Sequence, residues 1–290
     1  MDLLITTFVL CYCGFVLFRL GNRFGLENPH RGQFLCATAI LLAVWSAWTA
    51  ESSLRWAQIL PFSSVVLVAN STVLIIVGVA GLIAGSQMVG GLRRVLLAMA
   101  LCMTAGWFIT GAMLQPLLNP VVLDGKGKWR DGVCLQRHEA SCAPAAVATL
   151  LAQHGIIRSE AQMATACLTS TRGTLALGAY RGLCVGTSGS DSKPATMVTT
   201  PSPQALATVS QHLPMLIHVN YEQQQPANLP ASRPAWFGSL WHQGGHAVVL
   251  LDREADGRWV VADPASGRVR WTTEYIQKIW VGEGLYLQRP

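Results

Sequence analysis

Charged residues are scarce in this chain of 290 residues: Asp, Glu, Lys and Arg make up 12% of it, whereas hydrophobic residues make up 51%. Soluble globular domains carry roughly 25% charged residues, about twice this share. The scarcity is concentrated before about residue 120, where the runs 34–50, 57–92 and 95–123 contain no charged residue. The composition therefore argues against an ordinary soluble protein and for one that meets a lipid bilayer.

The apolar runs are long enough to cross a membrane, which takes about 17 to 25 residues of α-helix. Four transmembrane helices are predicted, at about 3–20, 33–51, 64–86 and 94–116. We thus expect an N-terminal four-helix transmembrane bundle in residues 1–118, a charged, glycine-broken linker in 119–132 and a separate domain in 133–290. The spans lack an ionisable residue near mid-membrane, which favours an anchoring or partner-binding bundle over a pump.

Basic residues gather in two of the three predicted loops: Arg19, Arg23 and Arg31 after the first span, and Arg93 and Arg94 after the third. Such loops stay in the cytoplasm. Everything after residue 120 is therefore predicted to lie on the outer, periplasmic side of a bacterial inner membrane, with the chain multi-pass. The first run lacks the basic leading region and the cleavage site of a signal peptide, so we expect it to remain as a span.

The net charge of +6 does not require a nucleic-acid partner, because part of it is this topology signal and no basic patch interleaved with aromatic residues accompanies it. Metal binding is not expected either. His242 and His246 have the spacing of a zinc-binding helix, but Gly244 and Gly245 disfavour a helix there and no third ligand follows at a useful distance. We expect no metal and no cofactor.

A cysteine stands at the start of a predicted helix in the C-terminal part. Ser141 suits the N-cap, Pro144 fits a first helical turn, and the Ala-rich run reaches Leu151 before Gly155 ends it. The unpaired backbone N–H groups of a helix N-terminus stabilise a thiolate, the nucleophilic form of cysteine. Cys142 is therefore a candidate nucleophile; the alternative is a buried structural cysteine.

A thiolate nucleophile needs a base and a third group that orients the base, and both usually come from distant parts of the chain. His246 opens an apolar, β-branched strand, and Asp263 ends a second strand that begins at Trp259. If these strands are adjacent and antiparallel, they bring His246 and Asp263 to the same end of a sheet. His138, close to the cysteine in sequence, is a weaker alternative base.

This combination resembles the bacteriocin-processing cysteine peptidases, papain-like enzymes that cleave leader peptides after a double glycine. The resemblance covers roughly residues 133–287. It rests on Gln136 six residues before Cys142, the Ala-rich helix, Gly-His246 leading into an apolar strand, and Asp263-Pro with a glycine shortly after. It implies an α+β papain-like domain with an antiparallel sheet, in which Cys142 is the nucleophile, His246 the base, Asp263 its orienting partner and Gln136 the oxyanion donor.

The chain departs from that family at the nucleophile, where Ser-Cys-Ala stands in place of the usual Asp-Cys-Gly; this puts substrate preference in question more than chemistry. We expect a membrane-anchored cysteine peptidase acting on peptides or leader peptides. Two alternatives stay open: a non-catalytic relative that binds leader peptides for a separate export machinery, and an acyl transferase that uses the same triad.

The remaining elements follow from local patterns. Helices are predicted at 159–167, 173–182, 202–212 and 273–279, strands at 133–136, 183–185, 213–220, 268–272 and 284–288, a long loop at 221–243 and an interfacial segment at 54–62. In an oxidising compartment a disulfide is expected among Cys134, Cys167 and Cys184, and sequence distance favours Cys167 with Cys184.

Overall fold

The structure is a computed structural model, and it describes residues 2–27, 34–42, 53–68, 72–86, 90–109, 115–125, 127–221 and 245–288. The chain forms two compact units. The helical unit consists of Met1–Ser53 and Val66–Gln115, and the sheet unit consists of Leu54–Val65 and Pro116–Pro290. The sheet unit is therefore built from two separate stretches of the chain.

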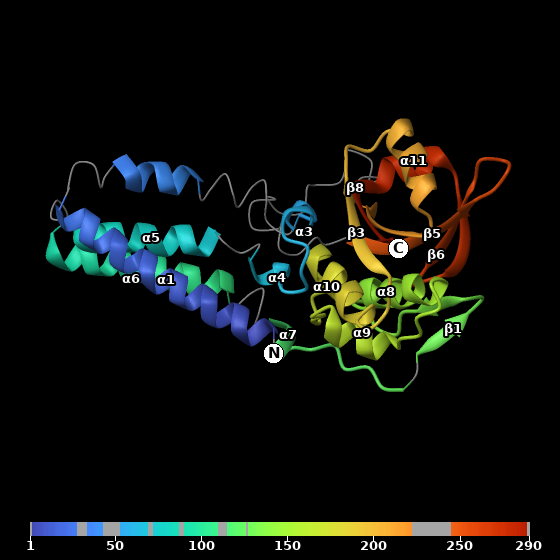
Figure 1. Ribbon diagram of the computed structural model, residues 1–290, viewed down its shortest axis with the longest axis horizontal. Helices are drawn as coiled ribbons and strands as arrows, with labels where there is room; N and C mark the ends of the chain where they lie inside the picture. Colours follow the sequence, from blue (N-terminus) through green and yellow to red (C-terminus); the bar gives the residue numbers. More distant parts are fainter. Residues whose placement is uncertain are drawn as a thin grey trace, which may run out of the picture. The chain divides into compact units, whose positions relative to one another are not determined.

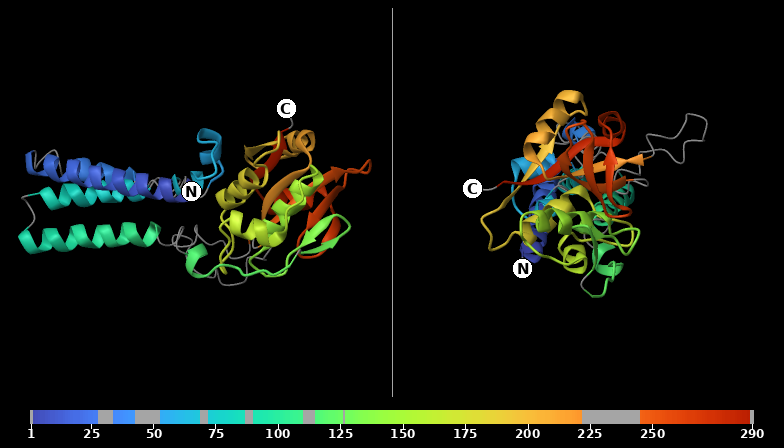
Figure 2. Two further views of the ribbon diagram at one scale, coloured as in Figure 1. Left: turned by 60° about the horizontal axis from the view of Figure 1, so that its bottom comes forward. Right: turned by 90° about the vertical axis from the view of Figure 1, so that its right-hand side faces the viewer.

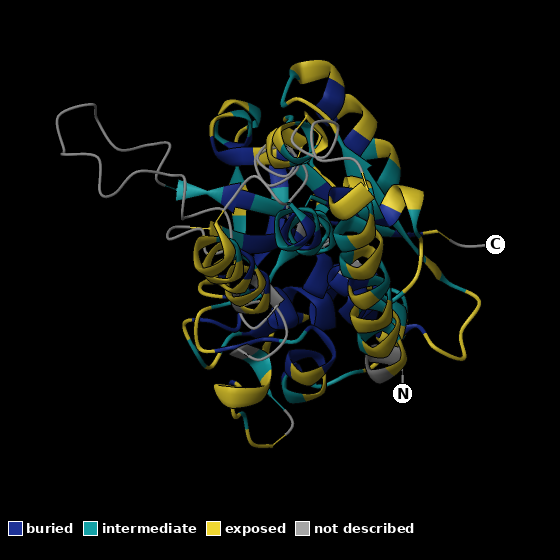
Figure 3. Cartoon of the chain, turned by 90° about the vertical axis from the view of Figure 1, so that its left-hand side faces the viewer, coloured by how far each residue is buried: buried dark blue, intermediate teal, exposed yellow. Residues whose placement is uncertain are grey.

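The helical unit contains three long helices: α1 (Asp2–Glu27), α5 (Thr72–Gly85) and α6 (Gly91–Ile109). Residues 34–42 are also helical. Helix α1 packs against α5, and α5 packs against α6 (Figure 2). Many large apolar side chains of these helices are exposed (Figure 3), including Phe8, Phe15 and Met103. Within the described ranges, one helix is long and apolar enough to cross a bilayer, Ile5–Glu27.

The other predicted spans lie partly outside the described residues. The span predicted at 33–51 is described only at 34–42, and the one at 64–86 is described as α4 (Val65–Val68) and α5. The span at 94–116 coincides with α6 and α7 (Gln115–Leu118), without the residues between them. The four-helix transmembrane bundle therefore stays a prediction.

Glycines set the close approach of α1 and α5. A Cβ atom at Gly21 would lie 2.6 Å from the carbonyl oxygen of Gly78, and one at Gly25 would lie 2.6 Å from that of Leu82. From the other side, a Cβ at Gly81 would overlap the backbone of Phe18. Small residues at such contacts are typical of helices that pack in membranes, where backbones approach closely.

The sheet unit contains a six-stranded sheet with the strand order β3-β8-β4-β5-β6-β7, in which every neighbouring pair is antiparallel (Figure 1). Its strands are β3 (Lys193–Val198), β4 (Met215–Asn220), β5 (Gly245–Arg253), β6 (Trp259–Asp263), β7 (Gly267–Trp271) and β8 (Trp280–Gln288). A separate hairpin joins β1 (Lys128–Arg130) to β2 (Val133–Leu135).

Helices cover both faces of this sheet (Figure 1). They are α8 (Cys142–Gln153), α9 (Glu160–Ala166), α10 (Ala176–Gly186), α11 (Pro203–Val209) with a 3₁₀ turn at Ser210–His212, and α12 (Thr273–Ile279). Helix α8 packs against β5, β4 and β6 and against β2, while α9 and α10 pack on α8. On the opposite face, α11 and α12 enclose a core that contains Ile217, Leu250 and Trp259. The α+β fold with an antiparallel sheet, predicted from the sequence, is confirmed.

One local prediction is wrong. The strand predicted at 183–185 is the last turn of α10, which buries Leu183 completely. Strand β3, which the sequence did not predict, is an edge strand that pairs with β8. An edge strand with one neighbour needs no alternation of apolar residues, so the pattern that reveals inner strands is absent there. The long loop predicted at 221–243 lies outside the described residues except for Tyr221.

The cysteines form no disulfide in the described structure, so the expected Cys167–Cys184 bridge is wrong. Cys167 is buried at the end of α9, and its sulfur packs against Gly182 of α10. Cys184 lies two residues further along α10, about 200° around a helix of 3.6 residues per turn. Its thiol hydrogen bonds with Tyr180 instead.

The segment Leu54–Val65, which includes α3 (Arg55–Ile59), packs inside the sheet unit. The backbone N–H of Leu54 donates to Oε1 of Glu283, 3.1 Å away, and the Leu54 side chain is fully buried. Further along, Arg181 of α10 donates to the carbonyl of Ser63, at 3.3 Å. A stretch expected to lie at the membrane surface is thus part of the unit that carries Cys142.

Candidate active site

Helix α8 places Cys142 at its first position, and the cysteine is half-buried. The residues behind it, Ala143 to Leu151, are all buried, which small alanines allow because they let the helix lie close to the sheet. The backbone N–H groups of a first helical turn lack intrahelical acceptors and point past the N-terminus. Cys142 therefore lies where a negative charge on sulfur is stabilised.

Ser141 occupies the N-cap position, but its side chain does not cap α8 as predicted. Its hydroxyl lies 2.7 Å from Oε1 of Glu160 and 2.7 Å from the carbonyl oxygen of His138, and it accepts the backbone N–H of His138 at 3.1 Å. The reason for the failed prediction is tertiary: a buried carboxylate competes for the hydroxyl that would otherwise bond to the helix.

His246 and Asp263 come from adjacent antiparallel strands, as expected. His246 is the second residue of β5, Asp263 is the last residue of β6, and the register pairs Val249 with Ala262. The Nε2 atom of His246 lies 2.7 Å from Oδ1 of Asp263, a distance typical of a charge-assisted hydrogen bond. Both side chains are largely buried, which strengthens the interaction by excluding water.

Cys142 also interacts with the imidazole of His246. Burial by itself lowers the pKa of His246, but its interactions with Asp263 and Cys142 outweigh this effect and raise the pKa from 6.5 to about 9. The imidazole is therefore protonated at neutral pH. A cationic imidazolium therefore lies beside the sulfur at the N-terminus of α8.

The turn after β6 holds Asp263 in place. Its Oδ1 accepts the backbone N–H of Ala265 at 2.9 Å, and its Oδ2 accepts the hydroxyl of Ser266 at 2.6 Å. Arg130 of β1 in turn donates to the carbonyl of Ser266. Burial favours the neutral carboxyl, yet these donors and His246 together lower the pKa of Asp263, so it stays ionised.

Gln136 follows β2 and is tied to the same turn. Its backbone N–H donates to the carbonyl of Pro264 at 2.8 Å, and its side-chain Nε2 donates to the carbonyl of His138 at 3.3 Å. Its Oε1 is buried and has no hydrogen-bond partner within the described part of the chain. Strand β2 is itself fixed to α8, because the N–H of Cys134 donates to the buried hydroxyl of Thr149 at 2.9 Å.

The structure thus brings Cys142 to the hydrogen-bonded pair of His246 and Asp263 and links Gln136 to this group through the turn after Asp263. The alternative base, His138, has its Nδ1 engaged by the backbone N–H of Ala140 at 3.0 Å. Within the described ranges, no group of three or more His, Cys, Asp or Glu residues is arranged to hold a metal.

Sequence reasoning missed several residues that support this group. Tyr221 directly follows β4, and its ring lies beside that of His246 with centroids 5.7 Å apart. Burial, together with the nearby Asp263, raises the pKa of Tyr221, so it stays neutral. Ser266 was detectable, because a hydroxyl shortly after an Asp-Pro pair is a turn signal. Glu160 was not, because its partners are about 20 positions away in sequence.

Comparison with protein-family models and with curated proteins gives no match. Solved structures similar to this chain include a double glycine motif protease from an AMS/PCAT transporter in complex with the leader peptide (19% identity, 58% of this chain and 97% of that chain covered, TM-score 0.40). They also include the peptidase domain of Streptococcus ComA, a bi-functional ABC transporter involved in a quorum sensing pathway (18%, 55% and 98%, TM-score 0.40). A third is the peptidase domain of Streptococcus mutans ComA (17%, 54% and 98%, TM-score 0.36).

Proposed function

We propose that this chain is a membrane-anchored cysteine peptidase that cleaves peptide or leader-peptide substrates with Cys142, His246, Asp263 and Gln136. One observation carries the proposal: a cysteine at a helix N-terminus interacts with an imidazole whose Nε2 lies 2.7 Å from a buried aspartate. Hydrolysis through a thioester needs a nucleophile beside a base, and a third group that orients the base.

The reaction follows from these positions. The thiolate of Cys142 attacks the scissile carbonyl carbon, a C–S bond forms, and the carbonyl π electrons move to oxygen. The protonated His246 then gives its proton to the leaving nitrogen as the C–N bond breaks, which leaves a thioester. Water attacks this thioester, His246 takes the proton from the water, and the C–S bond breaks to release the acid and restore the thiolate. Asp263 keeps the ring oriented and stabilises its positive charge.

Gln136 supplies the donor for the tetrahedral oxyanion. A side-chain amide has two N–H bonds, and in Gln136 one of them is directed at the carbonyl of His138. That contact leaves the second N–H for a substrate oxygen, together with the backbone N–H of Cys142. Donors held in advance at the oxyanion position are usually the largest single contribution to such catalysis.

Membrane placement is supported by the way the chain is divided between the units. Leu54–Val65 and Pro116–Pro290 belong to one compact unit, so the chain between them leaves that unit and returns to it. In a bilayer, the chain from 66 to 115 would then begin and end on the same side. Arg93 and Arg94 lie between the uncharged stretches 57–92 and 95–123, and positively charged loops stay in the cytoplasm. The sheet unit therefore lies on the outer side of the inner membrane.

A cleavage assay tests the proposal. The full-length chain in lipid nanodiscs is incubated with a synthetic leader-type peptide that carries a double glycine, and the products are analysed by mass spectrometry. The intact chain is expected to yield two hydrolysed fragments, whereas Cys142→Ala yields none while its thermal unfolding is unchanged. Cys184→Ala, which removes another half-buried cysteine of the same unit, is the matched control and retains cleavage. Full cleavage by Cys142→Ala would overturn the proposal.

The same assay separates the other chemistries. Binding of the peptide without fragments, by the intact chain, would identify a non-catalytic binder of leader peptides. Fragments whose new C-terminus is joined to an added amine would identify acyl transfer rather than hydrolysis, because both pass through the same thioester.

A further inference from the structure

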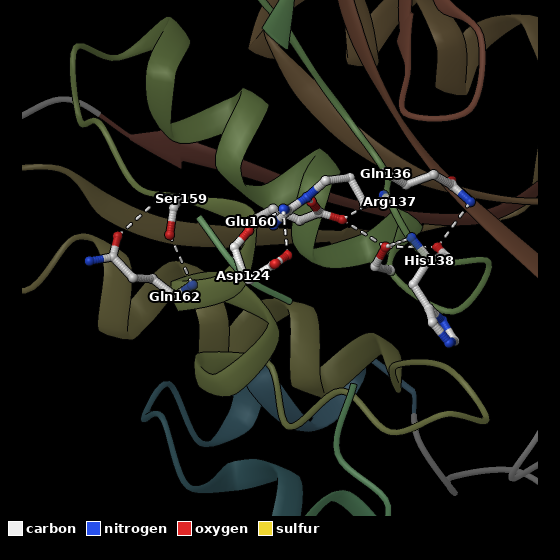
Figure 4. Close-up of polar contacts among 8 residues, drawn as sticks. Asp124, Gln136, Arg137, His138, Ser159, Glu160 and Gln162 are labelled. Atoms are coloured by element: carbon white, nitrogen blue, oxygen red, sulfur yellow. Dashed lines mark hydrogen bonds and ion pairs between the residues drawn. The ribbon is translucent and has the colours of Figure 1, made fainter. Parts of the chain in front are cut away.

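A fully buried carboxylate lies beneath the loop that precedes the nucleophile. Glu160 is 0% exposed, and its Oε2 accepts the guanidinium Nε of Arg137 at 2.8 Å. Its Oε1 accepts the backbone N–H of Arg137 at 2.9 Å (Figure 4). The same oxygen lies 2.7 Å from the hydroxyl of Ser141. Burying a carboxyl group without such donors would be costly, so these contacts compensate for its burial.

The two residues that Glu160 holds are those next to the proposed reacting groups. Arg137 directly follows Gln136, and Ser141 directly precedes Cys142. One carboxylate therefore fixes both ends of the loop that joins the oxyanion donor to the nucleophile. The hydroxyl of Ser141 also hydrogen bonds with the backbone N–H and carbonyl of His138. The same carbonyl accepts a hydrogen bond from Nε2 of Gln136.

Glu160 is not needed to begin its own helix. Helix α9 is started by a capping box, in which Ser159 accepts the backbone N–H of Gln162 at 3.1 Å and the Gln162 side chain accepts the backbone N–H of Ser159 at 2.9 Å (Figure 4). These two residues satisfy the first backbone donors of the helix. The carboxylate of Glu160 instead points away from α9 and into the loop.

We propose that Glu160 is a positioning residue for the peptidase reaction: through Arg137 and Ser141 it fixes the 136–142 loop so that the Gln136 amide and the Cys142 backbone N–H face one oxyanion. The inference rests on the proposed function. Its role is separate from the making of the thiolate, which depends on His246 and Asp263 on other strands.

Two reactions of Cys142 separate these roles. Hydrolysis of a Gly-Gly-aminomethylcoumarin peptide needs the oxyanion donors, whereas alkylation by iodoacetamide needs the thiolate and no oxyanion. Trypsin releases Cys142 in the peptide 138–158, which contains no other cysteine, so its alkylation is followed by mass spectrometry in the full-length chain. Glu160→Gln is expected to lower kcat about 10- to 100-fold, as a displaced catalytic group does, with alkylation at pH 7.5 within about twofold of the intact chain.

A double-mutant cycle tests whether Glu160 acts through Gln136. Gln136→Ala is expected to lower kcat about 100-fold or more. Adding Glu160→Gln to it should lower kcat by much less than Glu160→Gln does alone, because two residues that act through one contact are not additive. A purely structural role would give independent, multiplying losses.

Two matched controls accompany the cycle. Gln162→Ala removes the capping box of α9 but keeps the carboxylate, so it should lower the unfolding temperature and leave kcat unchanged. Asp124→Asn removes the exposed carboxylate that lies 3.4 Å from Arg137, and it should change neither quantity.

The outcomes are distinct. If the intact chain hydrolyses the probe and Glu160→Gln has an unchanged kcat, Glu160 does not have this role. The same holds if Glu160→Gln loses kcat and alkylation rate equally. In both cases the proposed function stands. Normal alkylation but no hydrolysis by the intact chain, with this probe or with the leader-type peptide, would overturn the proposed function and this role with it. A fall in kcat for Gln162→Ala as large as that for Glu160→Gln would show that α9 stability, rather than the carboxylate, sets the rate.

Discussion

The Nε2 atom of His246 lies 2.7 Å from Oδ1 of Asp263, and this contact joins the start of β5 to the end of β6. Because Nε2 is directed at the carboxylate, Nδ1 is the ring nitrogen left for Cys142. The contact therefore orients the ring and helps to raise its pKa to about 9.

Replacing this aspartate tests that effect. Asp263→Asn removes the negative charge and leaves an amide of the same shape, so the pKa of His246 should fall from about 9 toward 6.5. Less imidazolium at neutral pH then leaves less thiolate, and alkylation of Cys142 at pH 7.5 should slow at least about tenfold. An NMR titration of ¹³C-labelled histidine measures the pKa, and iodoacetamide labelling measures the rate.

Ser266→Ala is the matched control for this substitution. It removes one hydrogen bond to Asp263, at 2.6 Å, but keeps the charge. The pKa of His246 should then stay well above 6.5. An unchanged pKa of His246 in Asp263→Asn would show that the aspartate does not control the ring.

The same pKa predicts how the stability of the chain depends on pH. The folded pKa of His246, about 9, is higher than the ordinary 6.5, so folding is favoured by proton binding at this site. This stabilisation is complete below about pH 6.5 and is lost as the pH rises through 9; it is on the order of 3 kcal/mol. Asp263 has the opposite sign: its lowered pKa contributes stability above about pH 4, which is lost as the pH falls.

Thermal unfolding of the full-length chain in detergent checks this sign. The unfolding temperature should fall between pH 6.5 and pH 9.5, and it should fall less in His246→Gln, which cannot titrate. An equal fall in both proteins would assign the pH dependence to other groups.

Local patterns were enough to predict much of the sheet unit. The helix at Cys142–Gln153 lies between Ser141 and Gly155, the positions that the sequence marks, and α12 has the limits predicted. The proximity of His246 and Asp263 followed from two short strands joined by a tight turn, because neighbours in sequence usually pair. These features depend on nearby residues only.

Long-range contacts were out of reach of the sequence. The side chain of Ser141 bonds to Glu160 rather than to its own helix, and nothing near either residue signals the other. Likewise, Leu54 lies more than 200 positions from Glu283, to which its backbone bonds. Partners of this kind are set by how the elements pack, which hydrophobic periodicity does not encode.

The packing of the Leu54–Val65 segment gives a third prediction. Leu54 is fully buried in the sheet unit, so Leu54→Ala should lower the free energy of unfolding of that unit by about 2 to 5 kcal/mol. Ile59, on the same short helix, is 70% exposed, and Ile59→Ala is expected to have little effect. Hydrogen exchange of β8, which carries Glu283, measures the loss in the intact chain. Equal exchange in the two variants would show that the segment does not stabilise the unit.

The contact between α1 and α5 gives the last prediction. A methyl group at Gly81 would overlap the backbone of Phe18, whereas one at Gly78, in the same helix, would meet nothing within 4 Å. Gly81→Ala should therefore force the helices apart and lower the unfolding temperature of the helical unit, while Gly78→Ala should leave it unchanged or raise it slightly, since alanine favours helix. Cysteines placed at Phe18 and Leu82 would report the separation by their rate of crosslinking. Slower crosslinking in Gly81→Ala alone is expected, and equal rates in both variants would mean that close backbone packing does not hold α1 against α5.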